Sequence, residues 1–177
     1  ETETGLRFAI IENEFGTVGV YGSLVDAAPD VLFELNDGCV CCSVRSDLLE
    51  VFVGLQSRLA DFDHVIIETT GLADPAPVMR LFERAEVGQF FTLNGVVAVV
   101  DAAHIEANLD EVEACAEQIT YADLLILNKT DGLPLQPLEA IEHRLATLNP
   151  LAKRVRAQHA QVDDELVLDM DRHRHEP

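Results

Sequence analysis

Three of the four cysteines in the sequence crowd into one short segment, "NDGCVCCS", at residues 36–43. Cys39, Cys41 and Cys42 follow one another closely, whereas the fourth cysteine, Cys115, lies far along the chain. Thiols this close in sequence cannot all form disulfides of sound geometry, and "CVCC" lacks the C-x-x-C spacing of a thioredoxin-like redox pair. A group of thiolates favours a soft metal ion such as zinc or copper(I). The segment therefore predicts a metal site.

The ligand set of this metal site can be completed in two ways. Zinc takes about four ligands, so three cysteines plus a carboxylate such as Glu12 would satisfy it, as would two cysteines, a carboxylate and water. A closed structural zinc site more often has two separated pairs of ligands. The single cluster favours a site that passes on or senses its metal, and a structural zinc domain is the alternative. Cys115 falls on a helical stripe, where we expect a small core residue.

A second candidate site follows the apolar run "DHVIIETTG" (residues 63–71). Glu68 ends this run with a carboxylate that can hold a magnesium ion directly or through water. Gly71 has no side chain, so its backbone N–H can approach a phosphate closely. Because an acidic residue at a strand end is common, this segment is a weak signal by itself.

The run "ADLLILNKTD" (residues 122–131) carries a third group of polar residues. The Asp131 carboxylate can accept hydrogen bonds from N1–H and the exocyclic amine of guanine, and adenine would leave these polar groups unpaired. We expect Asn128 to tie neighbouring loops together and the Lys129 stem to cover the base. The alternative is an ordinary polar turn, but the position after a buried strand and downstream of "ETTG" favours guanine recognition.

Two other apolar runs also end in polar residues. Glu12, Asn13 and Glu14 follow an early run, in the position that a switch segment occupies in nucleotide-driven proteins. The run "VVAVVDAAH" (residues 96–104) ends in Asp101 and His104, and we expect His104 to be a surface or capping residue.

The elements that must position these residues alternate between strands and helices. Short apolar runs predict strands that are buried on both faces, and apolar residues at helical spacing predict helices between them. This alternation predicts an α/β fold with a mostly parallel sheet and helices on both faces, whose ligands bind beyond the carboxyl ends of the strands. The strand runs are "LRFAII", "DVLFEL", "DHVIIE", "NGVVAVVD" and "ADLLILN"; the helical stripes are Leu48, Phe52, Leu55 and Leu59, then Val112, Cys115, Ala116 and Ile119, then Leu138, Ile141, Leu145 and Leu148.

Composition limits the partners and the location. With 177 residues, 48% of them hydrophobic, the chain is long enough for one well-buried globular domain. It has no apolar run near the ~18 residues of a membrane span and no signal-peptide pattern at its start, so we expect a cytoplasmic protein without membrane contact. A net charge of -20 argues against nucleic acid. Basic partners and metal cations fit this charge, as does an acidic surface that is merely solvated.

Taken together, the motifs "ENEFG", "NDGCVCCSVRSDL", "VIIETTGLADPAPV", "GVVAVVDAAH" and "ADLLILNKTD" closely resemble the nucleotide-binding domain of the CobW-like GTPases, relatives of UreG and HypB that deliver or allocate metals. The resemblance covers about residues 6–150. It implies a P-loop GTPase-like fold with GTP and Mg2+ as cofactors, and Zn2+ or Co2+ as the metal. The residues carried over are Cys39, Cys41, Cys42 and Glu12 at the metal, Glu68 and Gly71 at the magnesium and γ-phosphate, and Asn128, Lys129 and Asp131 at the base.

The sequence departs from the family pattern at both ends. It contains no G-x-x-x-x-G-K-[ST] phosphate-binding loop, and "ETETGLR" resembles the segment just after the family's first helix. We expect the fold to be incomplete at the N-terminus, with the loop upstream of Glu1, because the "VIIE" strand would otherwise keep an unpaired edge. A variant with a damaged nucleotide site is the alternative. Residues 1–158 are thus predicted to form the GTP-binding domain. Residues 159–177 are predicted to be a frayed acidic tail with His173 and His175, at the start of a missing C-terminal region.

The resemblance predicts a GTP-dependent metallochaperone that transfers its metal to a metal-requiring target protein. Nucleotide state would change the segments "ENEFG" and "ETTGLADP" and so the geometry at the cysteines. Without the phosphate-binding loop, we expect the chain as printed to hydrolyse GTP poorly or not at all. The alternative is a non-catalytic metal-binding or metal-sensing protein with a degenerate nucleotide site. Relatives often pair across nucleotide, so the resemblance also allows a homodimer.

Overall fold

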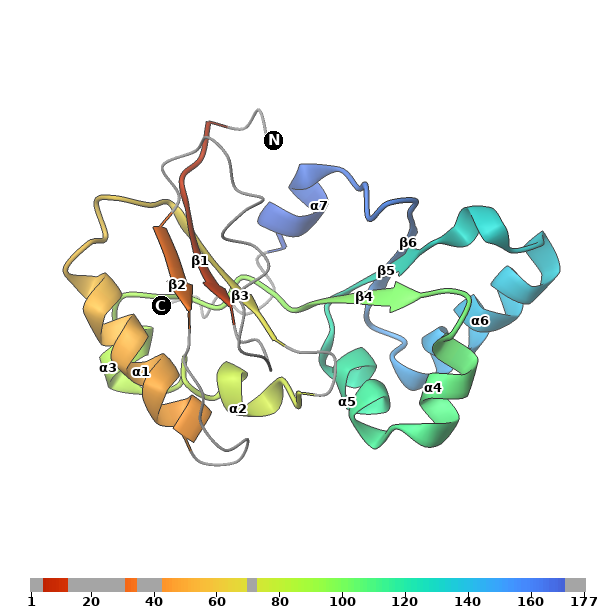
Figure 1. Ribbon diagram of the computed structural model, residues 1–177, viewed down its shortest axis with the longest axis horizontal. Coiled ribbons are helices and arrows are strands. Elements are labelled where there is room, and N and C mark those ends of the chain that lie inside the picture. The colour runs from red at the N-terminus through yellow and green to blue at the C-terminus, as the bar shows by residue number, and fades with distance from the viewer. Residues whose placement is uncertain (1–4, 13–30, 35–42, 70–72, 171–177) are drawn as a thin grey trace. The chain divides into compact units, whose positions relative to one another are not determined.

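A computed structural model describes residues 5–12, 31–34, 43–69 and 73–170, with the backbone alone described at 12, 31–34 and 43–47. The chain forms two compact units (Figure 1): unit 1 contains residues 1–71 and 77–91, and unit 2 contains residues 72–76 and 92–177. Unit 1 has β1 (Phe8–Glu12), β2 (Val31–Glu34), α1 (Ser43–Gln56), β3 (His64–Glu68) and α3 (Ala85–Gly88), and α2 (Ala76–Met79) begins at the last residue of the 72–76 segment. Unit 2 has β4 (Val97–Asp101), α4 (Ile105–Glu111), α5 (Glu113–Tyr121), β5 (Leu124–Asn128), the 3-10 turn η2 (Thr130–Gly132), α6 (Leu135–Leu148), β6 (Lys153–Arg156) and α7 (Asp164–Leu168).

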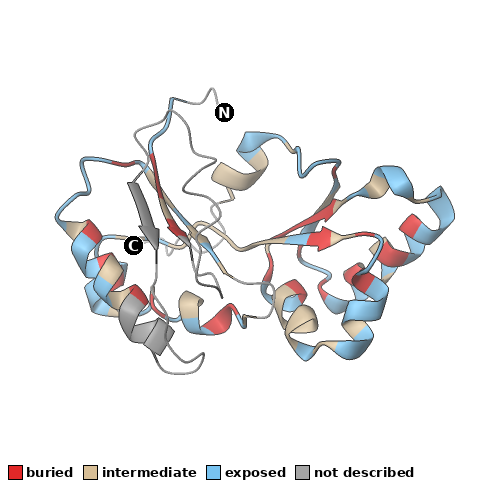
Figure 2. Cartoon of the chain, in the orientation of Figure 1, coloured by how far each residue is buried: buried red, intermediate tan, exposed pale blue. Residues whose placement is uncertain are grey.

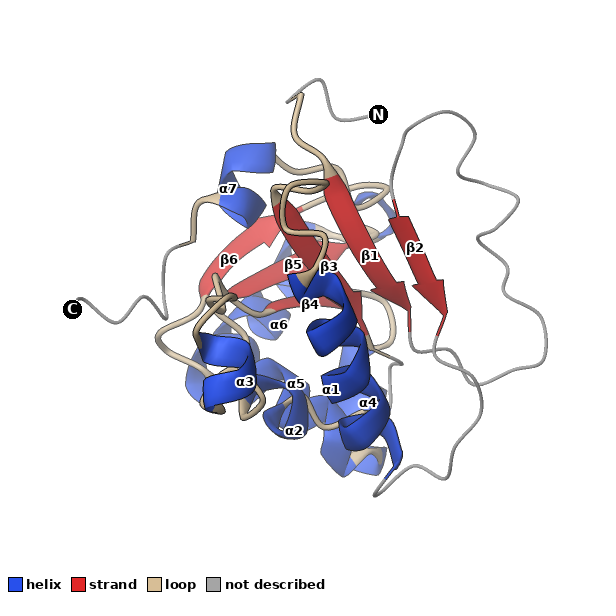
Figure 3. Cartoon of the chain, turned by 90° about the vertical axis from the view of Figure 1, so that its left-hand side faces the viewer, coloured by secondary structure: helices blue, strands red, loops and turns tan. Residues whose placement is uncertain are grey.

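Unit 1 is built on a parallel sheet in the order β2-β1-β3 (Figure 3). The strands are in register at their carboxyl ends, where Glu12 of β1 has Glu34 of β2 and Glu68 of β3 as its Cα partners. The parallel arrangement was predicted from the apolar runs, and it is confirmed. It places the residues that follow these strands at one edge of the sheet.

The core of unit 1 lies between this sheet and α1. Leu48, Phe52 and Leu55 are buried as predicted, and they pack against Ala9 and other residues of β1 and β3. The predicted continuation of this stripe to residue 59 is wrong. The helix ends at residue 56 in a turn, which leaves the side chain at 59 exposed.

Two predicted strands are not buried on both faces. Ile66 of β3 is 44% exposed and Val99 of β4 is 59% exposed. Each of these strands pairs with one neighbour, β3 with β1 and β4 with β5, and no other described strand pairs with its second edge. By contrast β5, which has partners on both sides, is buried from Leu124 to Leu127.

Unit 2 has a parallel sheet in the order β4-β5-β6 with a core on each face. Leu125 and Leu127 of β5 pack with α4, α5 and α6, whereas Leu124 and Ile126 face the segment that contains α7. Figure 2 marks the buried residues in the strands and helices of this unit in red. Helices on both faces of the sheet, as predicted, are therefore present in this unit.

The helices of unit 2 depart from the predicted stripes at two positions. Val112 has extended backbone angles and separates α4 from α5, so it caps α5 and is not part of its stripe. Leu148 ends α6 and is 37% exposed, so the buried stripe of α6 stops at Leu145. Cys115 is partly buried against the core, as expected of a core residue, and burial raises the pKa of its thiol.

The prediction of a frayed tail from residue 159 is wrong as far as residue 170, because this stretch contains α7. The Asp163 carboxylate begins the helix by accepting a hydrogen bond from the Glu165 N–H at 3.2 Å. Leu166, Val167 and Met170 then pack against the second face of the sheet. Three apolar contacts thus order a segment whose acidic composition resembles a solvated tail. His173 and His175 lie outside the described residues.

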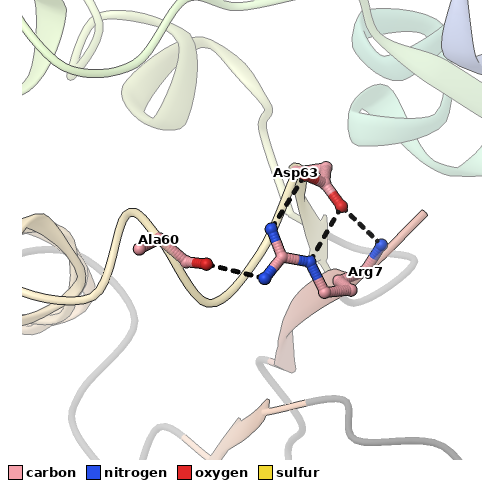
Figure 4. Close-up of polar contacts among 3 residues, drawn as sticks. All are labelled: Arg7, Ala60 and Asp63. Atoms are coloured by element: carbon pink, nitrogen blue, oxygen red, sulfur yellow. Dashed lines mark hydrogen bonds and ion pairs between the residues drawn. The ribbon is translucent and has the colours of Figure 1, made fainter.

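Arg7 joins the starts of β1 and β3 (Figure 4). Its Nε and Nη2 donate to the Asp63 carboxylate at 3.1 and 3.0 Å, its backbone N–H donates to the same group at 2.9 Å, and its Nη1 donates to the Ala60 carbonyl at 2.6 Å. Hydrogen bonds from the Arg7 side chain and backbone lower the pKa of Asp63 from 3.8 to about 2. The bidentate geometry fixes the register of the two strands at this end.

Replacing Arg7 with alanine removes its ion pair with Asp63 and is expected to lower the melting temperature near neutral pH. The expected decrease is only about 2 °C, because the side chains of Arg7 and Asp63 are both partly exposed. The pKa of Asp63 is lowered in the folded state, so its contribution is complete above about pH 4 and is lost as the pH falls toward 2. The difference between wild type and Arg7→Ala should therefore shrink over that range in urea unfolding. Arg58→Ala, which breaks the exposed Arg58–Asp61 pair, is the control. A difference for Arg7→Ala that stays constant down to pH 2 would contradict the assignment.

No helix in the described ranges has both the length and the apolar character needed to cross a membrane.

Candidate functional site

The carboxyl ends of β4 and β5 bring a set of polar residues together in unit 2. Asp101 is the last residue of β4 and Asn128 the last of β5, and the two are Cα partners in the parallel register. The N–H of Ala102 donates to the Asn128 carbonyl at 3.0 Å, which continues the pairing one step beyond β4. The two loops that leave the sheet here therefore start side by side.

The loop after β5 has a fixed backbone. Lys129 adopts the left-handed conformation, with φ 60° and ψ 35°, and the turn η2 follows it directly. Thr130 Oγ1 donates to the Ala157 carbonyl at 3.1 Å, and Asn128 Oδ1 accepts a hydrogen bond from the Ala160 N–H at 2.8 Å. Asn128 thus ties the loop after β5 to the loop after β6, as a loop-tying residue would.

The Asp101 carboxylate lies beside this loop and accepts three hydrogen bonds. Lys129 Nζ donates to Oδ2 at 2.8 Å, His104 Nδ1 lies 3.1 Å from the same oxygen, and the Ala103 N–H donates to Oδ1 at 2.9 Å. The Lys129 ammonium above all, with His104 and the Ala103 N–H, lowers the pKa of Asp101 to about 2. Asp101 is therefore a fixed anion at neutral pH. His104 is exposed and stands at the N-cap of α4, which agrees with the surface or capping role predicted for it.

Asp131 lies in the turn η2 and is exposed. Its carboxylate can meet a ligand without any loss of core packing. Together, Asn128, Lys129 and Asp131 occupy one loop, which the Asn128 and Thr130 side chains bind to the loop after β6. This arrangement can present an acidic group to the edge of a planar base and an aliphatic stem to its face.

The other predicted site residues belong to unit 1. Glu68 ends β3 with an exposed carboxylate, in register with Glu12 at the end of β1. An exposed carboxylate at a strand end is a suitable oxygen ligand for magnesium. Gly71 and the three clustered cysteines, Cys39, Cys41 and Cys42, lie outside the described residues, as do Asn13 and Glu14. Within the described ranges, no group of three or more His, Cys, Asp and Glu side chains could hold a metal ion.

The segment after "ETTG" is held by a residue that sequence reasoning missed. Gln118 of α5 donates from Nε2 to the Ala73 carbonyl at 2.9 Å, and Asp74 Oδ1 accepts from the Ala76 N–H at 2.8 Å. No pattern around Gln118 identifies this contact, because it joins residues 45 positions apart. The contacts of Asp101 with Lys129 were also missed, although the position of Asp101 at a strand end was a usable signal.

The family model and the similar proteins found by comparison agree on one family. The CobW/HypB/UreG nucleotide-binding domain model matches residues 1–156. The zinc chaperone YjiA of Escherichia coli is 35% identical over 164 residues, which cover 90% of this chain and 51% of that protein. The zinc-regulated GTPase metalloprotein activator 1 of Schizosaccharomyces pombe is 33% identical over 180 residues, which cover 97% of this chain and 44% of that protein. The chain thus spans about half the length of these curated relatives.

The fold agrees with this match. The crystal structure of the Zn(II)-bound YjiA GTPase from Escherichia coli superimposes with a TM-score of 0.73 at 28% identity, covering 97% of this chain and 55% of that one. The predicted α/β architecture of the P-loop GTPase type is therefore confirmed. Since the family model covers most of the 177 residues, the chain belongs to the CobW/HypB/UreG family.

Proposed function

We propose that this chain is the core of a GTP-dependent zinc metallochaperone, which binds zinc through Cys39, Cys41 and Cys42 with Glu12 and transfers it to a metal-requiring target protein. Thiolates favour zinc over magnesium, and the same ligands accept Co2+. The names of the relatives support this proposal, since one is called a zinc chaperone and another a zinc-regulated GTPase metalloprotein activator. Zinc is here the cargo of the protein. A homodimer and a cytoplasmic location belong to the same proposal.

The observation that carries the nucleotide half of the proposal is the loop after β5. Asp131 is exposed, Lys129 is held in a left-handed conformation, and Asn128 bonds to the loop after β6. These are the properties needed to accept hydrogen bonds from guanine, to cover its ring and to keep both loops in place. Guanine nucleotide is therefore the proposed ligand of this loop.

Magnesium and the phosphates would be held elsewhere. Glu68 is the residue whose donor chemistry and position suit Mg2+, and Gly71 would approach the γ-phosphate. When bound, Mg2+ neutralises charge on the β- and γ-phosphates. The printed sequence contains no G-x-x-x-x-G-K-[ST] loop, so we propose that the 177 residues alone hydrolyse GTP poorly. Adding upstream residues that carry this loop should raise turnover.

Zinc competition with a chelator tests the metal half of the proposal. The zinc affinity of Cys41→Ala, Cys42→Ala is expected to be at least about 100-fold weaker than that of wild type, because two direct ligands are lost. Zinc affinity should also change when GTP and magnesium are added, since the proposed nucleotide-dependent segments begin at the ends of β1 and β3, on the sheet edge where β2, the strand before the cysteines, also ends. Cys115→Ala is the matched control: this cysteine packs against the core of unit 2, so its removal should leave zinc affinity unchanged.

Other outcomes separate the alternatives. Tight, cysteine-dependent zinc binding that ignores nucleotide, even in a chain extended by a G-x-x-x-x-G-K-[ST] segment, would favour a non-catalytic metal-binding or metal-sensing protein. Unfolding when zinc is stripped would favour a structural zinc site. Zinc binding that does not depend on Cys41 and Cys42 would refute the proposal.

A further inference from the structure

The contact between Asp101 and Lys129 is built by the sheet. Asp101 ends β4 directly opposite Asn128, so the residue after Asn128 lies within reach of the Asp101 carboxylate. The distance from Lys129 Nζ to Asp101 Oδ2 is 2.8 Å. His104 and the Ala103 N–H bind the same carboxylate and hold its orientation. The Asp101 carboxylate that binds Lys129 is therefore held in place by residues of the loop after β4.

Both ends of the Lys129 side chain are held. Its backbone is fixed in the left-handed conformation between Asn128, which bonds to Ala160, and Thr130, which bonds to Ala157. Its ammonium is fixed by Asp101. Between these two points lies an aliphatic stem that would otherwise sample many rotamers. The stem therefore has a set direction, toward the end of β4, before any ligand arrives.

The pair contributes little to folding. The Lys129 side chain is 65% exposed and that of Asp101 is 27% exposed. An ion pair at such a surface adds little stability, because it is screened and orders a long side chain. The Lys129–Asp101 contact lies beside the proposed ligand loop, so it can contribute more to ligand binding than to folding. A side chain that is ordered before the ligand binds lowers the entropic cost of association.

We propose that Asp101 is a positioning residue for base recognition: it holds the Lys129 stem extended toward the end of β4, beside the loop after β5, so that the stem lies ready to cover the face of a purine. This inference rests on the proposed guanine binding by the same loop. Asp101 itself touches no part of the base. It acts through Lys129, so its effect should be the same for every purine with the same ring face.

The first test needs no nucleotide. The sequence contains two lysines, Lys129 and Lys153, so each can be followed separately by mass spectrometry after brief acetylation with acetic anhydride. In wild type, Lys129 should react more slowly than the exposed Lys153, because its amine is held against a carboxylate. In Asp101→Asn, the ratio of the two rates should move toward one. Asp110→Asn, which weakens the Asp110–Arg144 pair on α4 and α6, is the matched control and should leave the ratio unchanged.

The second test measures nucleotide binding by the same full chain, with ligand-observed NMR. Asp101→Asn should weaken binding of GDP and of inosine diphosphate by the same factor, about fivefold, because methylene contacts with the ring face are lost in both. If Asp101 had only a structural role, Asp101→Asn would lower the melting temperature and would also change the relative affinity for the two nucleotides. The melting temperature of Asp101→Asn should stay close to that of wild type.

Each remaining outcome contradicts a specific step. An unchanged ratio of lysine reactivity in Asp101→Asn overturns the inference, because Asp101 would then not hold Lys129. A changed ratio with unchanged affinity for both nucleotides also overturns it, while base preference that still depends on Asp131 would leave the proposed function intact. Absence of any GDP binding, with or without an added phosphate-binding loop, refutes the proposed guanine site and the inference with it.

Discussion

Replacing Asn149 with leucine is expected to destabilise unit 2 by about 3 kcal/mol. Asn149 is 7% exposed and forms a buried junction between α5, α6 and the start of β6. Its Nδ2 donates to the carbonyls at the end of α5, and its Oδ1 accepts from two backbone N–H groups before β6. The partners are the carbonyls of Ile119, Thr120 and Ala122, at 2.9, 3.0 and 2.8 Å, and the N–H groups of Leu151 and Ala152, at 3.1 and 3.0 Å.

The cost arises because leucine leaves these backbone groups without their partner in a buried setting, and each such group costs about 1–3 kcal/mol when it is not compensated. Amide hydrogen exchange at α5 and β5 measures the effect within unit 2. Asn108→Leu makes the same change at an exposed site of α4 and should leave exchange close to wild type. Equal protection in Asn149→Leu and wild type would contradict the role of the junction.

Asn149→Asp refines this test. The introduced carboxylate keeps the two accepted hydrogen bonds but turns a negative charge toward three carbonyl oxygens. Burial and these oxygens would raise the pKa of the new carboxyl in the folded state, so the variant is most destabilised above that raised pKa. Its stability relative to wild type should recover as the pH falls from that raised pKa to the unfolded value, about 4, and should stay constant below it, where the carboxyl is neutral in both states.

Replacing Asp131 with asparagine is expected to weaken GDP binding by about 100-fold and to favour xanthosine diphosphate. Guanine presents two donors, N1–H and the 2-amino group, and a carboxylate accepts both. Asparagine offers one acceptor and one donor, so its amide would set a donor against the 2-amino group. Xanthine has a carbonyl oxygen at that position and can accept from the amide.

The measurement is the ratio of GDP to xanthosine diphosphate affinity for wild type and Asp131→Asn. Asp164→Asn changes another exposed aspartate of unit 2 and should leave this ratio unchanged. If the ratio were the same in Asp131→Asn and wild type, Asp131 would not contact the 2-position of the base. The variant isolates base recognition, because the turn η2 is exposed and contributes no buried residue to the core.

The sheets could be predicted from sequence wherever strands are rich in apolar residues. The run that became β5 is apolar at four successive positions, and its burial on both faces follows from its central place. The strand β6 was missed because "KRVR" has a single apolar residue, Val155, among basic ones. Its extended conformation comes from pairing with β5, which a local pattern does not reveal.

Helix ends and edge exposure were harder to predict. Leu59 and Leu148 continue an apolar stripe in sequence, yet α1 ends before the first and α6 ends at the second. The exposure of Ile66 and Val99 depends on which strands flank β3 and β4, and this is a property of topology. In sequence, a run of apolar residues has the same appearance whether its strand lies at the edge or in the centre of a sheet.

The candidate site could also be predicted only in part: the sequence located its strand-end residues but not the contacts that hold them. The residues at strand ends, Glu68 and Asn128, lie where the rule for parallel sheets puts them. The contacts that hold them were not readable from sequence, because they join distant segments, as between Asn128 and Ala160. The cysteine cluster stays a prediction, since it lies outside the described residues.

The outer edges of β3 and β4, which pair with no other described strand, have a further consequence for handling the 177-residue chain. Both strands present apolar residues, Ile66 and Val99, next to backbone groups that pair with no other described strand. Such edges are templates for pairing between molecules and lead to aggregation unless something covers them. The net charge of -20 opposes aggregation, because the molecules repel one another. Salt screens this repulsion, so it should promote aggregation of the 177-residue chain. Preparations of this chain should therefore be kept dilute and at low ionic strength.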